Sequence, residues 1–244
     1  MLLLAAHGSR DVRFSATARR VAAVTAQSLP GVRVELAYLD LNEPLLEDSL
    51  AQLRGEVVVV PLLFGDGFHS KIDLPAILAR AHRRNRALRA VAAPVIGRHS
   101  PVPALVDRLT EAGMRPGDGV LMYAVGSSDA GSDASIRARG RELSSVLGVP
   151  VETVFATRLG HDGAAVADAV SRLRRQGASR IAASPLFLSA GLLTERVERR
   201  LDQIAPGSLV AGPVADHPAV IGAVVRLYLS AAPAGLPHPA VAPA

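Results

Sequence analysis

The chain has 244 residues and a formal net charge of +5, and 49% of its residues are hydrophobic. This length accommodates two domains of roughly 120 residues, each able to bury a core. The absence of cysteine excludes disulfides, thiolate metal sites and cysteine-held iron–sulfur clusters. Aromatic residues make up 3%, too few to supply stacking surfaces for single-stranded nucleic acid, and the basic residues suit a small polyanionic ligand at least as well.

The N-terminal apolar run, residues 1–6, is not typical of a signal peptide. It has no preceding basic region and it stops at His7, which is too early for such a segment. No stretch of the sequence reaches the length of a membrane span. We therefore expect a soluble, cytoplasmic protein that has neither a membrane nor a nucleic acid as its partner.

The first half of the chain alternates between short apolar runs and helical periodicity. The expected strands are residues 2–6, 32–39, 56–61 and 87–93. The expected helices are residues 12–29, a segment from about 44, 75–85 and 101–112, with a loop at 62–73. Val57 to Val60 form a continuous β-branched run, which is typical of a strand covered on both faces.

The same pattern then starts again. The expected strands are residues 120–125, 149–156, 179–185 and 208–211, and the expected helices are residues 132–147, 163–176, 192–204 and 218–230. Strands that alternate with helices indicate an α/β fold of two tandem, similar parallel-sheet domains with helices on both faces. We predict one domain over residues 1–115, a second over 116–230, and a disordered, proline-rich tail over 231–244.

Short motifs recur between the halves but differ in their chemistry. Residues 6–9 (AHGS) correspond to residues 124–127 (AVGS), and residues 61–64 (PLLF) correspond to residues 185–188 (PLFL). His7 is thereby matched by Val125, and His69 is matched by Leu193. Because the second copy keeps the turns without these imidazoles, a chemical role for them in the first half is favoured over a purely structural one.

Three polar residues of the first half, His7, Asp40 and His69, follow successive expected strands. The carboxyl ends of parallel strands share one edge of the sheet, where open sheets bind ligands. Two imidazoles and one carboxylate suit a divalent transition metal with open coordination positions. Each residue alone has a structural alternative, such as a strand-end hydrogen bond or an exposed loop position. Glu43 is a competing carboxylate, although a first-turn helix position favoured by the helix dipole explains it better than metal ligation does.

Other polar residues have mainly structural interpretations. His99 and His217 occupy corresponding places in the two halves, so we expect both to serve the fold, for example as helix caps. His82, beside two arginines, is expected to be solvated. Asn42 can cap the helix that is expected to start near Pro44.

Residues 6–10 (AHGSR), residues 38–44 (YLDLNEP), and residues 61–64 (PLLF) with His69 and residues 73–75 (DLP) form three blocks in chain order. They resemble the signature blocks of the sirohydrochlorin chelatases, the cobalt- and iron-inserting class II chelatases. Residues 93–94 with Gly97 and His99 resemble a fourth block. The resemblance covers nearly the whole chain, because the long members of that family are tandem duplications.

The resemblance implies a chelatase fold of two pseudo-twofold α/β domains with a cleft between them. It also implies metal ligands at His7 and His69, which are then the catalytic residues, and a carboxylate ligand at the end of the second strand. That family usually has glutamate there, whereas this chain has Asp40, so Glu43 stays as a reserve ligand.

The activity that the resemblance implies is insertion of a divalent metal into sirohydrochlorin, for cobalamin or siroheme biosynthesis. Two pyrrole protons are exchanged for one Co²⁺, Fe²⁺ or Ni²⁺, and no organic cofactor is needed. Ser9, Arg10, Lys71 and Arg98 are the expected substrate-binding residues, since a basic rim attracts the eight carboxylates of the tetrapyrrole. We expect a monomer or a homodimer.

Two other functions stay open. One is a metal- or tetrapyrrole-binding carrier without turnover. The other is a hydrolase that uses His7 as a nucleophile, as histidine phosphatases do. Those enzymes need an arginine directly before the histidine, whereas this chain has Ala6, which argues against the second alternative.

Overall fold

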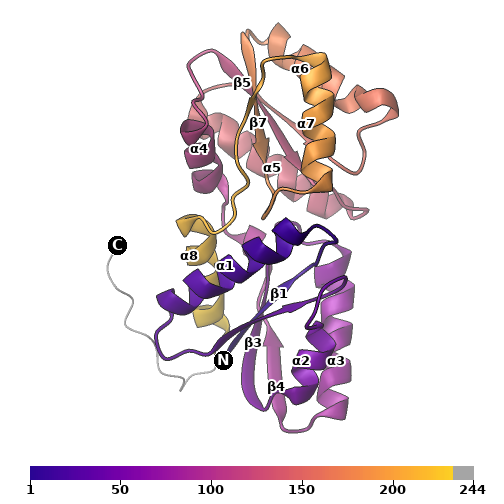
Figure 1. Cartoon of the computed structure of the whole chain (residues 1–244), viewed down its shortest axis with the longest axis vertical. Coiled ribbons are helices and arrows are strands. Elements are labelled where there is room, and N and C mark those ends of the chain that lie inside the picture. Colours follow the sequence, from indigo (N-terminus) through magenta and orange to yellow (C-terminus); the bar gives the residue numbers. More distant parts are fainter. Residues whose placement is uncertain (233–244) are drawn as a thin grey trace. The chain divides into compact units, whose positions relative to one another are not determined.

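The computed structural model of the chain describes residues 1–232, and the predicted disordered tail lies outside the described residues from position 233 onward. The chain forms two compact units: unit 1 comprises Met1–His99 together with the chain from Asp216, and unit 2 comprises Ser100–Ala215. Each unit holds a four-stranded parallel sheet with helices on both faces (Figure 1). The predicted α/β class with two similar sheets is confirmed.

The sheet of unit 1 has the strand order β2-β1-β3-β4, and every neighbouring pair is parallel. Its strands are β1 (Leu2–Ala6), β2 (Val34–Tyr38), β3 (Gly55–Pro61) and β4 (Leu88–Ala92). Its helices are α1 (Val12–Ser28), α2 (Leu46–Gln52), α3 (Leu74–Arg84) and α8 (Pro218–Ala231), with a π-helical turn η1 (His69–Asp73) and a 3₁₀ turn η2 (Ile96–Arg98).

Strand β1 is buried along its whole length because helices cover both faces of the sheet. Leu3 and Ala5 of β1, with Val57 and Val59 of β3, pack in one core cluster with apolar residues of α2 and α3. Helices α1 and α8 pack against each other on the opposite face (Figure 1). This double cover explains the continuous apolar runs of β1 and β3 in the sequence.

Unit 2 repeats this architecture with the strand order β6-β5-β7-β8. Its strands are β5 (Asp118–Ala124), β6 (Val151–Phe155), β7 (Arg180–Pro185) and β8 (Leu209–Val210). Its helices are α4 (Val102–Glu111), α5 (Ala130–Leu147), α6 (Ala164–Arg175) and α7 (Leu192–Ile204), with a 3₁₀ turn η3 (His161–Gly163) before α6. Apolar residues of β5, α6 and α7 form one core cluster.

The compact units differ from the predicted domains, 1–115 and 116–230. Helix α4 closes the first sequence repeat but packs against α5 and β7 of unit 2, and α8 closes the second repeat but packs against α1 and β3 of unit 1. The apolar face of α8, which includes Val220, Val224 and Leu227, is buried in this position. The repeats are therefore continuous in sequence, whereas the folded units exchange their last helices.

Local details differ from the prediction where side chains bind backbone groups. The second helix begins at Leu46 rather than near Pro44, and Asn42 accepts a hydrogen bond from the Ser9 N–H at 2.7 Å instead of capping that helix. His82 is exposed as expected, and its Nε2 also accepts a hydrogen bond from the Ala90 N–H at 3.1 Å. His217 does cap a helix: its Nδ1 accepts from the Ala219 N–H at the start of α8.

The N-cap residue of α4 is Pro101, which makes no side-chain cap hydrogen bond. The Ser100 hydroxyl accepts a hydrogen bond from the Val102 N–H at 3.2 Å. Among residues 1–232, no helix combines the length and the apolar character needed to cross a bilayer.

Candidate metal site

The topology of unit 1 creates a ligand-binding position at the end of β1. From β1 the chain crosses to β2 on one side, and it then returns to β3 on the other side of β1. The loops that follow β1 and β3 therefore run to opposite sides of the sheet, and open α/β sheets bind ligands at this switch point. His7 follows β1 directly, and His69 ends the loop that follows β3.

The loop after β1 is held tightly to the end of β2. The His7 carbonyl accepts a hydrogen bond from the Asp40 N–H at 3.0 Å. Gly8 follows with φ of +102°, and a Cβ there would lie 1.8 Å from the Asp40 carbonyl oxygen. Glycine permits both this φ and this close approach, so Gly8 lets the loop that carries His7 lie directly against the end of β2.

His69 is the first residue of η1, where the Leu74 N–H bonds to the His69 carbonyl five residues back. Single π-helical turns of this kind are frequently found at functional sites. The loop before η1, residues 62–68, packs against η2, where the Gly97 N–H donates a hydrogen bond to the Leu63 carbonyl at 3.1 Å. A Cβ at Gly97 would lie 1.8 Å from the Phe64 carbonyl oxygen. Close backbone packing thus sets the position of the segment that carries His69.

The two imidazoles meet through their Nε2 atoms, which lie 2.9 Å apart. The ring centroids are separated by 4.4 Å and the ring planes cross at 87°. His7 Nδ1 bonds to the Gly8 carbonyl at 3.1 Å, and His69 Nδ1 bonds to the Asp73 carboxylate at 2.7 Å. A carbonyl and an ionised carboxylate only accept hydrogen bonds, so in a neutral imidazole that donates from Nδ1 to such a partner the unprotonated nitrogen is Nε2.

The 2.9 Å between the two Nε2 atoms is a hydrogen-bond distance, which one imidazole spans by donating to the other. Imidazole nitrogens bind first-row metals at about 2.1 Å. Two such nitrogens in adjacent positions about 90° apart therefore lie about 3 Å from each other. The observed spacing matches that of adjacent ligands of one divalent ion, with the remaining coordination positions open.

The third predicted ligand does not join this pair. Asp40 is exposed, and its carboxylate accepts a hydrogen bond from the neighbouring Leu41 N–H at 2.7 Å. Within residues 1–232, no group of three histidine, cysteine, aspartate or glutamate side chains is placed to hold one ion. Glu43 is likewise exposed in the loop before α2. The structure thus brings together His7 and His69 but neither carboxylate proposed from the sequence.

The carboxylate that does reach the pair is Asp73, to which the sequence reasoning assigned no role. It lies four residues after His69, a spacing at which side chains meet on a helical turn. The sequence shows the four-residue spacing between His69 and Asp73. That spacing indicates a side-chain contact only in a helical segment, and residues 62–73 were expected to form an irregular loop.

The predicted substrate-binding residues lie on the segments around the histidine pair. The Ser9 hydroxyl accepts from the Asp11 N–H at 3.0 Å, and Ser127 makes the same contact with Asp129 in unit 2. This hydroxyl therefore shapes the start of the following helix in both copies. Arg10, Lys71 and Arg98 are exposed, on the loop after β1, on η1 and on η2 respectively.

The corresponding position of unit 2 has the same backbone without the imidazoles. The Thr157 N–H donates to the Val125 carbonyl at 3.1 Å, as the Asp40 N–H does to His7. Val125 thus occupies the place of His7, and 45% of its surface is exposed. Arg158 binds the Ser127 carbonyl and the Asp133 carboxylate nearby. Val125 therefore offers no metal ligand, and the nearby Asp133 carboxylate is paired with Arg158.

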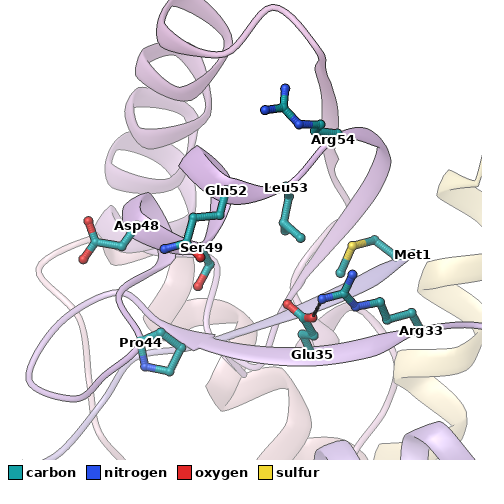
Figure 2. A pocket seen from close by; sticks show the side chains of 9 residues that line it. All are labelled: Met1, Arg33, Glu35, Pro44, Asp48, Ser49, Gln52, Leu53 and Arg54. Carbon is teal, nitrogen blue, oxygen red and sulfur yellow. Dashed lines mark ion pairs between the residues drawn. The ribbon is translucent and has the colours of Figure 1, made fainter.

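A separate pocket of about 550 Å³ lies at the β2 edge of unit 1 (Figure 2). Its lining includes Met1, the Arg33–Glu35 ion pair and Arg54. Its lining includes none of His7, Asp40, Glu43 and His69. The pocket is therefore distinct from the candidate metal site.

The family model described as CbiX matches residues 1–112 and again residues 119–231. The chain is 26% identical over 213 residues to the sirohydrochlorin cobaltochelatase of Priestia megaterium, covering 83% of this chain and 68% of that protein. It is 25% identical over 201 residues to the sirohydrochlorin ferrochelatase of Bacillus subtilis (strain 168), covering 79% and 76%.

Solved structures with the same fold include SirB from Bacillus subtilis with Fe³⁺, with a TM-score of 0.77, 24% identity and 94% of both chains covered. The structure of CbiX described as the terminal enzyme for biosynthesis of siroheme in denitrifying bacteria has a TM-score of 0.70 and 21% identity, covering 95% of this chain and 99% of that one. At these identities the likeness concerns the fold.

Proposed function

Because the chain belongs to the CbiX family, of which it contains two tandem copies, we propose that it inserts a divalent metal ion, Co²⁺ or Fe²⁺, into sirohydrochlorin. The observation that carries this proposal is the pair of imidazoles of His7 and His69, whose Nε2 atoms lie 2.9 Å apart at the switch point of unit 1. The metal is a substrate, and the pair is its entry position. The relatives from Priestia megaterium and Bacillus subtilis, named for cobalt and iron, support this assignment.

The two imidazoles hold the ion through few ligands, and this suits a protein that has to release it. A site with open positions lets ring nitrogens of the tetrapyrrole bind the metal before the imidazoles let go. The pyrrole nitrogens lose two protons as one M²⁺ enters. The two Nε2 lone pairs that the metal leaves are free to accept these protons. Because His69 is 47% exposed, the protons can pass on to water and the site is regenerated.

Charge near the pair supports binding of an anionic substrate. Arg10, Lys71 and Arg98 lie on the three segments that surround the two histidines. Guanidinium and ammonium groups pair well with carboxylates, so we assign these residues to the substrate's acid groups. The Asp40 N–H donates a hydrogen bond to the His7 carbonyl, so Asp40 lies beside His7 in space. We assign Asp40 as a further metal ligand, with Glu43 as the alternative, once the Asp40 carboxylate releases the Leu41 N–H.

The reaction as proposed uses no organic cofactor and no nucleotide, because exchange of protons for a metal needs neither an oxidant nor a phosphoryl donor. Co²⁺, Fe²⁺ and Ni²⁺ all accept imidazole ligands, so the site chemistry admits each of them. A role in tetrapyrrole biosynthesis favours the cytoplasm as the compartment.

The first prediction is that removal of either imidazole abolishes insertion. Purified chain is incubated with sirohydrochlorin and Co²⁺, Fe²⁺ or Ni²⁺, and the absorbance change of the tetrapyrrole gives the rate. We expect His7→Ala and His69→Ala to lower the catalysed rate at least about a hundredfold. His161→Ala is the control, because that side chain is 95% exposed in unit 2, and it should keep the wild-type rate.

Circular dichroism shows whether the variants are folded. Folded His7→Ala and His69→Ala proteins with unchanged rates would contradict the proposed site. A wild-type protein that binds metal or tetrapyrrole but gives no rate above the uncatalysed background would favour a carrier instead.

A further inference from the structure

We propose that Asp73 is a positioning residue for metal insertion, which holds His69 in the one tautomer that binds the metal. This inference rests on the proposed function of the His7–His69 pair. It is based on the 2.7 Å contact between the Asp73 carboxylate and His69 Nδ1, the ring nitrogen that does not face His7. Asp73 reaches the metal only through the imidazole.

The contact determines where the proton of His69 lies. A neutral imidazole carries one proton, on either Nδ1 or Nε2, and only the unprotonated nitrogen binds a metal. The Asp73 carboxylate accepts from Nδ1–H and thereby leaves Nε2 free. It also prevents rotation of the ring and increases the electron density on the coordinating nitrogen, as carboxylates behind metal-binding histidines generally do.

The His69–Asp73 contact contributes little to the stability of the fold. The side chains are 47% and 35% exposed, and exposed pairs of this kind contribute about 0–1 kcal/mol to folding. The same contact has a large effect on ligand geometry, because it involves the ring that meets His7. A carboxylate in this position therefore matters more for His69 than for the stability of unit 1.

The duplication offers an internal comparison. His69 corresponds to Leu193 of α7, and at the same spacing Asp73 corresponds to Val197. Val197 is fully buried in the core cluster of unit 2. The imidazole and its carboxylate are thus both replaced by apolar residues in the copy that has no histidine pair. This joint replacement is expected if Asp73 serves His69 and has no separate function in the fold.

The geometry of η1 explains how the two side chains meet. The π-helical turn begins at His69 and ends at Asp73, so its five residues place both side chains on one side of the turn. The preceding turn offers a matched control. The Ser70 hydroxyl donates to the Asp66 carboxylate at 2.7 Å, so Asp66 makes a contact over the same spacing but touches neither histidine.

The test compares Asp73→Ala and Asp73→Glu with Asp66→Asn in the full chain. The tautomer of His69 is read in the metal-free protein at pH 8 from the ¹⁵N shifts of its imidazole, with His69→Ala to assign the signals. Co²⁺ affinity is measured by titration without tetrapyrrole. Steady-state kinetics with sirohydrochlorin then separate kcat from the KM for the metal.

We expect wild-type His69 to be protonated on Nδ1 and Asp73→Ala to lose this preference. The Co²⁺ affinity of Asp73→Ala should fall about 10- to 100-fold, with a raised KM for the metal and an unchanged KM for the tetrapyrrole. Asp73→Glu should recover most of the affinity because it restores a carboxylate. Asp66→Asn should stay within about twofold of wild type.

An Asp73→Ala protein that keeps the Nδ1–H tautomer and binds Co²⁺ within about twofold of wild type would overturn the inference, even if wild type is active. A wild type that fails to insert metal would overturn the proposed function instead. The tautomer and the Co²⁺ affinity of Asp73→Ala would in that case still test the role of Asp73.

Discussion

At the scale of single residues, the candidate site depends on backbone contacts that orient a few side chains. His7 and His69 could be predicted because both follow strands that end at one edge of the sheet. The direction of the Asp40 carboxylate could not, because it depends on a turn at Leu41, which has φ of +64°. That turn presents the Leu41 N–H to the carboxylate, and sequence patterns do not reveal such local competition.

Gly8 provides a prediction at this scale. Alanine there would need φ of +102° and would place its Cβ 1.8 Å from the Asp40 carbonyl oxygen. We expect Gly8→Ala to lower the free energy of unfolding by about 3 kcal/mol or more, and to displace His7. Gly31→Ala is the control, since Gly31 has φ of +80° but no atom within 4 Å of the added Cβ, and it should cost about 1 kcal/mol.

Urea unfolding measures both differences, and metal insertion by the folded fraction shows whether the His7–His69 pair is kept. Equal losses of stability in the two variants would mean that backbone strain alone, and not the close approach of Gly8 to Asp40, determines the requirement for glycine.

At the scale of elements, the strands and helices were predictable because apolar periodicity differs between them. Strand β1 and helix α7 have the predicted bounds. Turn η1 was not predictable, because a single π-helical turn has no repeating pattern. The exchange of α4 and α8 was not predictable either. Amphipathic periodicity shows that a helix has a buried face, but it does not show which sheet that face covers.

The ion pair between Asp118 and Arg180, where β5 pairs with β7, should make the stability of the fold depend on pH. Asp118, which begins β5, accepts from Arg180 at 3.0 and 2.6 Å and from the Arg115 N–H at 2.7 Å. The Arg180 guanidinium is the main cause that lowers the pKa of Asp118. The carboxylate is 4% exposed, so Asp118→Asn should cost about 2 kcal/mol at pH 7.

The sign of the pH effect follows from the lowered pKa. The ionised carboxylate stabilises the fold above about pH 4, the usual value in an unfolded chain, and this contribution is lost as the pH falls from there toward the lower folded-state pKa. The difference between wild type and Asp118→Asn in urea unfolding should therefore shrink between pH 5 and pH 3. A difference that stays constant over this range would contradict the assignment.

At the scale of the whole molecule, duplication separates fold from chemistry. Both units keep the same strand order and the same contact between the ends of their first two strands. Unit 1 alone keeps the two imidazoles. This asymmetry could be predicted from the sequence by comparing corresponding positions of the two repeats. The boundaries of the compact units could not be predicted, because sequence repeats do not reveal an exchange of helices.

We accordingly predict that Val125→Ile and Leu193→Met leave metal insertion within about twofold of wild type. Both positions correspond to the metal ligands of unit 1, yet neither side chain can bind a metal or transfer a proton. Swaps of similar volume cost less than about 1.5 kcal/mol. His7→Ala and His69→Ala are the matched variants of unit 1. A large loss of rate in folded Leu193→Met would give unit 2 a direct part in the reaction.

The central claim is that His7 and His69 bind the substrate metal together. X-ray absorption of the chain loaded with one equivalent of Co²⁺, before tetrapyrrole is added, tests this most directly. We predict two imidazole nitrogens at about 2.1 Å from the metal, one in each of His7→Ala and His69→Ala, and none in the double variant. The same two-imidazole signal in the double variant would contradict the account.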